Sequence, residues 1–239
     1  MSTTEQRVQD LKSENDEVRE RAAKALMDFP DPAALEALLV ALDDRDNMVR
    51  RYAAGALGAA RDARAVPRLI QQAIKHDDRG SRSMATAALG TIGDGAATAT
   101  LIALLADTEN TIRLNAARAL GQIRDRRAVP VLIGALRDPQ NGVRGTAIEA
   151  LGAIGDPAAV QPLVEYYWST EGDRRSSGKH GWDLAMREWT DRRRIGDLID
   201  FIRMDSSEDR IIQSLARSLE LIRETTGEAG GSEPSPGSA

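Results

Sequence analysis

The chain of 239 residues lacks several residue types and patterns that chemistry commonly needs. It has no cysteine, which excludes disulfides, thiol catalysis and cysteine-based metal sites. Only two histidines occur, His76 and His180, and there is no His-Glu-x-x-His pattern, nucleophile elbow or phosphate-binding glycine loop. We therefore expect no catalytic residue, no metal and no cofactor.

Long apolar runs are also missing. No stretch approaches the roughly 20 apolar residues of a membrane span, and the first residues have no apolar signal-peptide region. The simple interpretation is a soluble cytoplasmic protein. The net charge of −5 argues against a nucleic-acid partner. Residues 51–150 nevertheless carry 14 Lys or Arg against 9 Asp or Glu.

What the sequence does contain is a repeat. The pattern Val-Arg-x-x-Ala-x-x-Ala-Leu-Gly recurs every 31 residues, with one spacing of 32 between the second and third copies. Its arginines are Arg19, Arg50, Arg82, Arg113 and Arg144. Its leucines are Leu26, Leu57, Leu89, Leu120 and Leu151. The aspartates that follow are Asp31, Asp62, Asp94, Asp125 and Asp156. Such self-similarity predicts a stacked repeat architecture.

Each repeat reads as two short antiparallel helices. In the copy from Ile112, apolar residues recur at helical spacing as far as Ile123. A polar break follows, and a second apolar run begins near Pro130, which is tolerated in a first helical turn. Because helices this short are marginal alone, neighbouring pairs must stack into one core. The many alanines let them approach closely, and aromatics are only 3% of the chain.

The repeat resembles the HEAT-like repeats found in phycobilisome lyase subunits. The resemblance rests on Asp-x-x-x-x-Val-Arg, which is matched from Asp44, Asp107 and Asp138. It implies an all-α fold, a right-handed α-α superhelix that forms a HEAT/armadillo-like solenoid of helical hairpins. It also implies that these aspartates and the repeat arginines hydrogen-bond across successive repeats as a ladder. Ser13 replaces the first aspartate, as an end repeat allows, and His76 and Ser81 replace the Asp and Val of the third copy. We expect the ladder to be interrupted there, with a local bend or a site.

The repeats do not fill the chain. We expect HEAT-like repeats over 1–168, as an N-terminal half repeat and five helix pairs. Divergent capping helices should follow over 169–227, after a loop at 169–181. The tail at 228–239 is rich in Gly, Ser, Pro and Glu and should be disordered.

Two surfaces are candidate sites. The concave face should present polar and large apolar side chains that protein interfaces favour. They are Arg51, Tyr52, Met84, Leu114, Asn115 and Arg118. Alternatively, Tyr52 and Met84 simply pack sideways.

The second candidate is an aromatic cluster beside the irregular loop, which could form a ligand pocket. Its residues are Tyr167, Trp168, Arg174, Arg175, His180 and Trp182. Alternatively, Trp182, Met186 and Trp189 only cap the open end of the stack. The regularly spaced aspartates are interpreted as helix caps, because Asp at a helix start accepts from backbone N–H groups.

Three functions remain open. The leading hypothesis is a non-catalytic scaffold that binds a protein partner on its concave face. A phycobilin lyase-like or bilin-protein chaperone role is implied only by the family resemblance. Nucleic-acid binding is favoured slightly by the local positive charge and opposed by the overall acidity.

Overall fold

The computed structural model describes residues 3–74, 78–166 and 210–226. The chain divides into two compact units, Met1–Val131 and Leu132–Ala239. The regular elements of the described ranges are all helices, which confirms the all-α class and the helical-hairpin repeats expected from the sequence. Within those ranges, no helix is long and apolar enough to cross a membrane.

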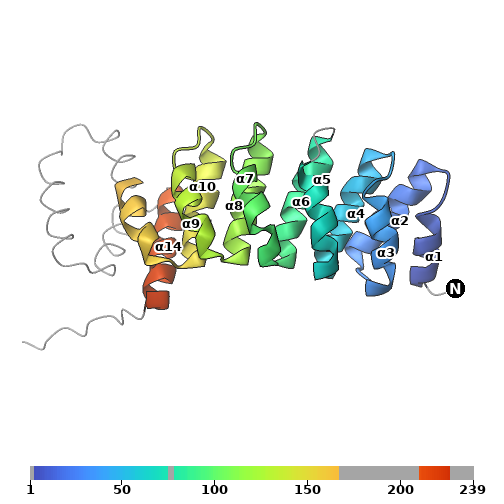
Figure 1. Cartoon of the computed structure of the whole chain (residues 1–239), viewed down its shortest axis with the longest axis horizontal. Helices are drawn as coiled ribbons and strands as arrows, with labels where there is room; N and C mark the ends of the chain where they lie inside the picture. The colour runs from blue at the N-terminus through green and yellow to red at the C-terminus, as the bar shows by residue number, and fades with distance from the viewer. Residues whose placement is uncertain (1–2, 75–77, 167–209, 227–239) are drawn as a thin grey trace, which may run out of the picture. The chain divides into compact units, whose positions relative to one another are not determined.

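The first unit consists of long and short helices in alternation. Its long helices are α2 (Asp16–Asp28), α4 (Asn47–Ala60), α6 (Arg79–Ile92) and α8 (Asn110–Ile123). Its short helices are α1 (Thr3–Asp10), α3 (Leu35–Ala41), α5 (Val66–Ile74) and α7 (Thr98–Leu104), and α9 (Val129–Ala135) begins at its end. Helices α2, α4, α6 and α8 pack side by side in chain order, here called the long-helix row (Figure 1). Helices α3, α5 and α7 each pack against the long helix that follows.

The repeated leucine and the small residues beside it explain the row. Leu26, Leu57, Leu89 and Leu120 are completely buried. A Cβ added to Gly58 would lie 2.8 Å from the Cβ of Ala88 on the next helix. Gly90 approaches Ala119 still more closely, at 2.6 Å. The close backbone approach of α4 to α6 and of α6 to α8 therefore depends on the Gly that follows Leu57 or Leu89 and on an Ala of the next helix.

A short 3-10 turn precedes each short helix after α1. These turns are η1 (Pro32–Ala34), η2 (Ala63–Ala65), η3 (Gly95–Ala97), η4 (Arg126–Ala128) and, in the second unit, η5 (Pro157–Ala159). The aspartate before each turn is its N-cap and accepts a hydrogen bond from the backbone N–H two residues later. This geometry is the helix-capping role that the sequence predicts for the aspartate series.

The second unit contains α10 (Asn141–Ile154), η5, a helical segment at 160–166 and α14 (Arg210–Thr226). Helix α14 packs against α10. A Cβ on Gly152 would lie 2.4 Å from the Cβ of Ser218, so Ser218 stands where Ala88 stands beside Gly58. Leu219 then has the register of the repeat leucine, and it is fully buried. Helix α14 thus packs on α10 as the next long helix would.

This register exposes an insertion. Leu219 follows Leu151 by 68 residues, which is 37 more than the period of 31. The expected loop at 169–181, the helices before residue 207 and the tail at 228–239 lie outside the described residues. Of the helices expected over 169–227, the structure describes α14, in which Leu219 and Ile222 are buried.

Candidate functional site

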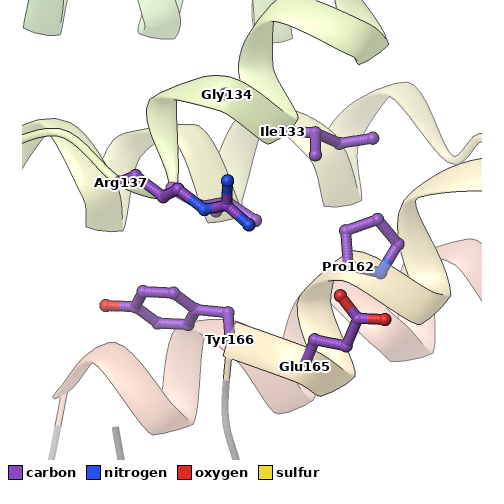
Figure 2. A pocket seen from close by; sticks show the side chains of 7 residues that line it. Ile133, Gly134, Arg137, Pro162, Glu165 and Tyr166 are labelled. Carbon is purple, nitrogen blue, oxygen red and sulfur yellow. The ribbon is translucent and has the colours of Figure 1, made fainter. Parts of the chain in front are cut away.

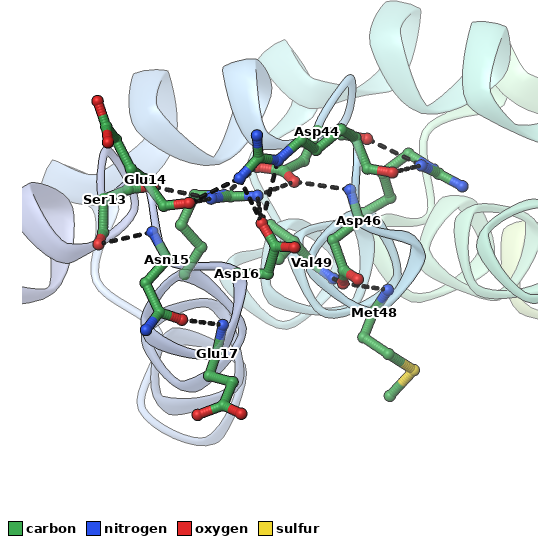
Figure 3. Close-up of polar contacts among 12 residues, drawn as sticks. Ser13, Glu14, Asn15, Asp16, Glu17, Asp44, Asp46, Met48 and Val49 are labelled. Carbon is green, nitrogen blue, oxygen red and sulfur yellow. Dashed lines mark hydrogen bonds and ion pairs between the residues drawn. The ribbon is translucent and has the colours of Figure 1, made fainter.

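The turns between repeats are joined by arginine and aspartate side chains. Arg19 of α2 is nearly buried, and its Nε and Nη2 donate to the two carboxylate oxygens of Asp44 at 2.7 and 2.9 Å. Its Nη1 donates to the backbone oxygen of Ser13, 2.8 Å away. Figure 3 shows Ser13 and Asp44 on successive turns that these contacts connect. One guanidinium therefore fixes its own turn and the next one.

The other rungs in the first unit repeat these contacts. Arg82 pairs with Asp107, and its Nε donates to the carbonyl of Ala73 at 3.1 Å. Arg113 donates to the backbone oxygen of Asp107 at 2.9 Å, six residues earlier, as Arg19 does to Ser13. In the second unit Arg144 makes the same bond to Asp138 at 2.6 Å. Because each turn offers its backbone oxygen, a Ser can replace the Asp in the first copy.

The expected interruption at the third copy is wrong. Arg50 forms its inter-repeat ion pair with Asp78, at 3.1 Å, in place of an aspartate at the usual position. Ser81, completely buried at the usual Val position, donates to the carboxylate of Asp78 and holds it there. The sequence suggested a break because Asp78 lies outside the Asp-x-x-x-x-Val-Arg spacing. His76 itself lies outside the described residues.

The ion pair between Arg50 and Asp78 has fewer hydrogen bonds than the regular pair between Arg19 and Asp44. Arg19 binds Asp44 through two nitrogens, whereas Arg50 reaches Asp78 through Nη2 alone and leaves its buried Nε without a hydrogen-bond partner. Burial favours the protonated form of Asp78, but hydrogen bonds from Ser81, from two backbone N–H groups and from Arg50 hold its pKa below the usual value. Asp78 is therefore a charged partner.

The residues predicted for a binding face lie on one side of the long-helix row. Arg51 and Arg118 are exposed, on α4 and α8. Tyr52, Met84 and Leu114 are half-buried, on α4, α6 and α8. The half-burial agrees with sideways packing and still leaves part of each side chain accessible. We call this set, together with Asn115, the row face.

Contacts between helices hold parts of the row face in place. Asn115 donates through Nδ2 to the hydroxyl and the carbonyl oxygen of Ser83 on α6, at 2.9 and 3.1 Å. Its Oδ1 accepts from Arg118 at 3.3 Å, a weak contact. A Cβ on Gly55 would lie 2.6 Å from the sulfur of Met27 on α2 and 3.5 Å from that of Met84 on α6. The two methionines therefore converge over Gly55, and Met27 belongs to the row face although the sequence prediction missed it.

The long helices of this face carry basic but no acidic residues. Helices α4, α6 and α8 contain no Asp or Glu in 14 residues each, and six arginines together. Of their six arginines, Arg50, Arg82 and Arg113 belong to the turns described above. Arg79 pairs with Glu109 at 3.1 Å. Within the described chain, Arg51 and Arg118 form no ion pair: Arg51 hydrogen-bonds to the sulfur of Met48 and lies against Gly80, near the Asp78 carboxylate, and Arg118 hydrogen-bonds to Asn115.

The pocket predicted from the aromatic cluster cannot be placed, because Tyr167, Trp168, Arg174, Arg175, His180 and Trp182 lie outside the described residues. The neighbouring Tyr166 is described, and it lines an open pocket of about 410 Å³ in the second unit. Figure 2 shows Tyr166 and Glu165 on one wall, with Arg137 and Ile133 on the facing one. This mixed lining is not specific for one class of ligand.

No group of three or more His, Asp or Glu residues within the described ranges is arranged to hold a metal ion. The repeated acids and bases bind one another or backbone atoms. The pKa of Asp125 is about 2, because the Arg127 side chain and its backbone N–H hydrogen-bond to the carboxylate. Such contacts suit a capping residue.

Comparisons with known proteins concern the fold. The sequence matches the family of HEAT repeats over residues 4–90, 39–113 and 98–178. No curated protein matches the sequence significantly. Among the solved structures of similar fold is an engineered protein with a TM-score of 0.61, which is 22% identical over 94% of this chain and 98% of its own. A designed armadillo repeat protein in complex with the peptide (KR)4 has the same TM-score and is 16% identical over 92% of this chain and 100% of its own.

A third similar structure is the complex of CpcE and CpcF of phycocyanin lyase from Nostoc sp. PCC7120. It is 20% identical over 94% of this chain and 95% of its own, with a TM-score of 0.45. That score is too low to support any statement about bilin chemistry in this chain.

Proposed function

Because the chain belongs to the HEAT-repeat family, we propose that it is a non-catalytic scaffold that binds a protein partner through the row face. The face carries the combination that energetic centres of protein interfaces favour, with Tyr, Met and Arg close together. The designed armadillo repeat protein of similar fold was solved with a bound peptide. This supports the choice of a protein partner for the present chain.

The observation that carries the proposal is the contrast between the row face and the turns. Arginines of the turns use their donors on aspartates and carbonyls, as Arg19 does with Asp44. Arg51 and Arg118 keep theirs largely free beside half-buried apolar side chains. The turn arginines are therefore explained by their role in stabilising the fold, whereas Arg51 and Arg118 are available to bind a partner.

The test compares partner capture by two forms of the full chain. One is wild type, and the other has alanine at Arg51, Tyr52, Leu114 and Arg118 together. Since these side chains are exposed or half-buried, the variant should stay folded, which circular dichroism checks. The proposal predicts that a protein captured stoichiometrically from the native cell lysate is lost with the folded variant. Undiminished capture would contradict the row face as the site.

A matched variant controls for general loss of surface charge. Arg64 is exposed on η2, outside the long-helix row, and carries the same charge as Arg51. Its replacement by alanine should leave capture unchanged. Nuclease treatment of the lysate separates a protein partner from one that is retained through nucleic acid.

A further inference from the structure

We infer that the partner segment bound by the row face is extended and acidic, with two carboxylates flanking apolar residues. This inference rests on the proposed function and specifies its partner. It starts from Arg51 and Arg118, two exposed cations without a carboxylate partner in the described chain. Helices α4, α6 and α8 contain no Asp or Glu, and the nearby carboxylate of Asp78, the N-cap of α6, is already bound by Arg50 and Ser81.

The surface between the two arginines is apolar and small. Gly55 and Ala87 contribute little side-chain bulk, and Met84 reaches toward Gly55 from α6. Met27 of α2 continues the apolar surface on the other side of Gly55. Methionine side chains adapt their shape and are favoured where apolar groups of a partner must be accommodated. Leu114 extends the apolar strip onto α8. A segment that follows the strip would therefore place apolar residues centrally and its charges at the ends.

Helix spacing sets the length of the segment. Adjacent packed helices lie roughly 8–10 Å apart, so α4 and α8, separated by α6, are roughly 16–20 Å apart. An extended chain rises about 3.3 Å per residue, and about five or six residues span that distance. Two carboxylates separated by about six positions can thus reach Arg51 and Arg118 together.

An acidic protein segment fits these features better than a nucleic acid does. A phosphate backbone presents charge at every nucleotide and is bound by many cations. The row face offers two available arginines with apolar side chains between them, and α2 beside it carries the exposed Glu17 and the half-buried Glu20. The chain as a whole has a net charge of −5.

The experiment uses the full chain and three labelled nonapeptides in fluorescence anisotropy. The first has Glu at positions 2 and 8 with Leu, Ala and Met between; the second has Gln at both positions, and the third Lys. Two exposed ion pairs predict that the Glu peptide binds roughly two- to thirtyfold more tightly than the Gln peptide in low salt. Raising the salt concentration should reduce the difference, because salt screens exposed charges.

A charge-reversed protein makes the test specific. The double variant Arg51→Glu, Arg118→Glu should prefer the Lys peptide, while Arg64→Glu should retain the wild-type order. Equal affinity for the Glu and Gln peptides, or binding of none of them, would overturn the acidic partner, as would tighter binding of a single-stranded oligonucleotide. Equal affinity combined with partner capture that depends on Tyr52 and Leu114 would leave the proposed function standing. Loss of that dependence would contradict the proposed function separately.

Discussion

Gly90 offers the sharpest test of how the repeats stack. It lies inside α6, where replacement by alanine would normally stabilise a helix by about 1 kcal/mol. Here the new methyl carbon would lie 2.6 Å from both the Cα and the Cβ of Ala119 on α8. No side-chain rotation moves a Cα, so the two helices would have to separate.

The expected size follows from these two opposing effects. Overpacking of a well-filled interface costs about 1–3 kcal/mol, and the close contact with backbone places Gly90→Ala toward the upper end. After subtraction of the gain in helix propensity, we expect Gly90→Ala to lower the free energy of unfolding by about 1–2 kcal/mol. Gly145 provides the matched control, because it is also inside a long helix but no atom lies within 4 Å of its added Cβ. Gly145→Ala should raise stability by about 0.5–1 kcal/mol.

Urea denaturation followed by circular dichroism measures both variants. The two midpoints should move in opposite directions with unchanged slopes. If Gly90→Ala stabilised the protein as much as Gly145→Ala, the close approach of α6 and α8 would be refuted.

Three further predictions concern the turns and the packing of α14. Arg82→Met should lower the free energy of unfolding in urea by about 3–5 kcal/mol, because it removes the buried ion pair with Asp107. Arg118→Met, at an exposed position, should change that free energy little. Similar losses for the two variants would argue against the structural role of the turn arginines. Because the pKa of Asp125 is lowered to about 2, its contribution to stability is present above pH about 4 and is lost as the pH falls toward 2. Asp125→Asn should therefore flatten this part of a plot of unfolding free energy against pH. An unchanged plot would contradict the hydrogen bonds from Arg127. Gly152→Ala should destabilise the protein as Gly90→Ala does, because its Cβ would lie 2.4 Å from Ser218; a neutral effect in thermal unfolding would contradict the packing of α14 on α10.

The periodic part of the fold is predictable because its determinants are local and repeated. The leucines of the repeat, the capping aspartates and the glycines after Leu57, Leu89 and Leu151 each have one structural role, which recurs at the same spacing from copy to copy. The register of α14 is less visible, because 37 extra residues separate Leu219 from its expected place. Only its contacts with Gly152 identify it as a repeat helix.

The turns and the row face show where sequence reasoning ends. The predicted interruption of the ladder at the third copy was wrong, because it considered only an aspartate at the regular sequence position. Asp78 lies two residues later, is held by Ser81, and still pairs with Arg50. The prediction missed Met27 for a related reason. Its contact with Gly55 is between two repeats, and the residue pattern within a single repeat does not indicate it. Helical periodicity, by contrast, correctly predicted that Arg51 and Arg118 are exposed.

Site-specific photo-crosslinking tests the central claim most directly. A benzoylphenylalanine is placed at Tyr52 or Leu114 on the row face, and at Val40 of α3, which is 75% exposed, as the control position. After irradiation in native cell lysate, the account predicts the same crosslinked protein from Tyr52 and Leu114 and none from Val40. A partner crosslinked from Val40, with no adduct at either row-face position, would contradict it.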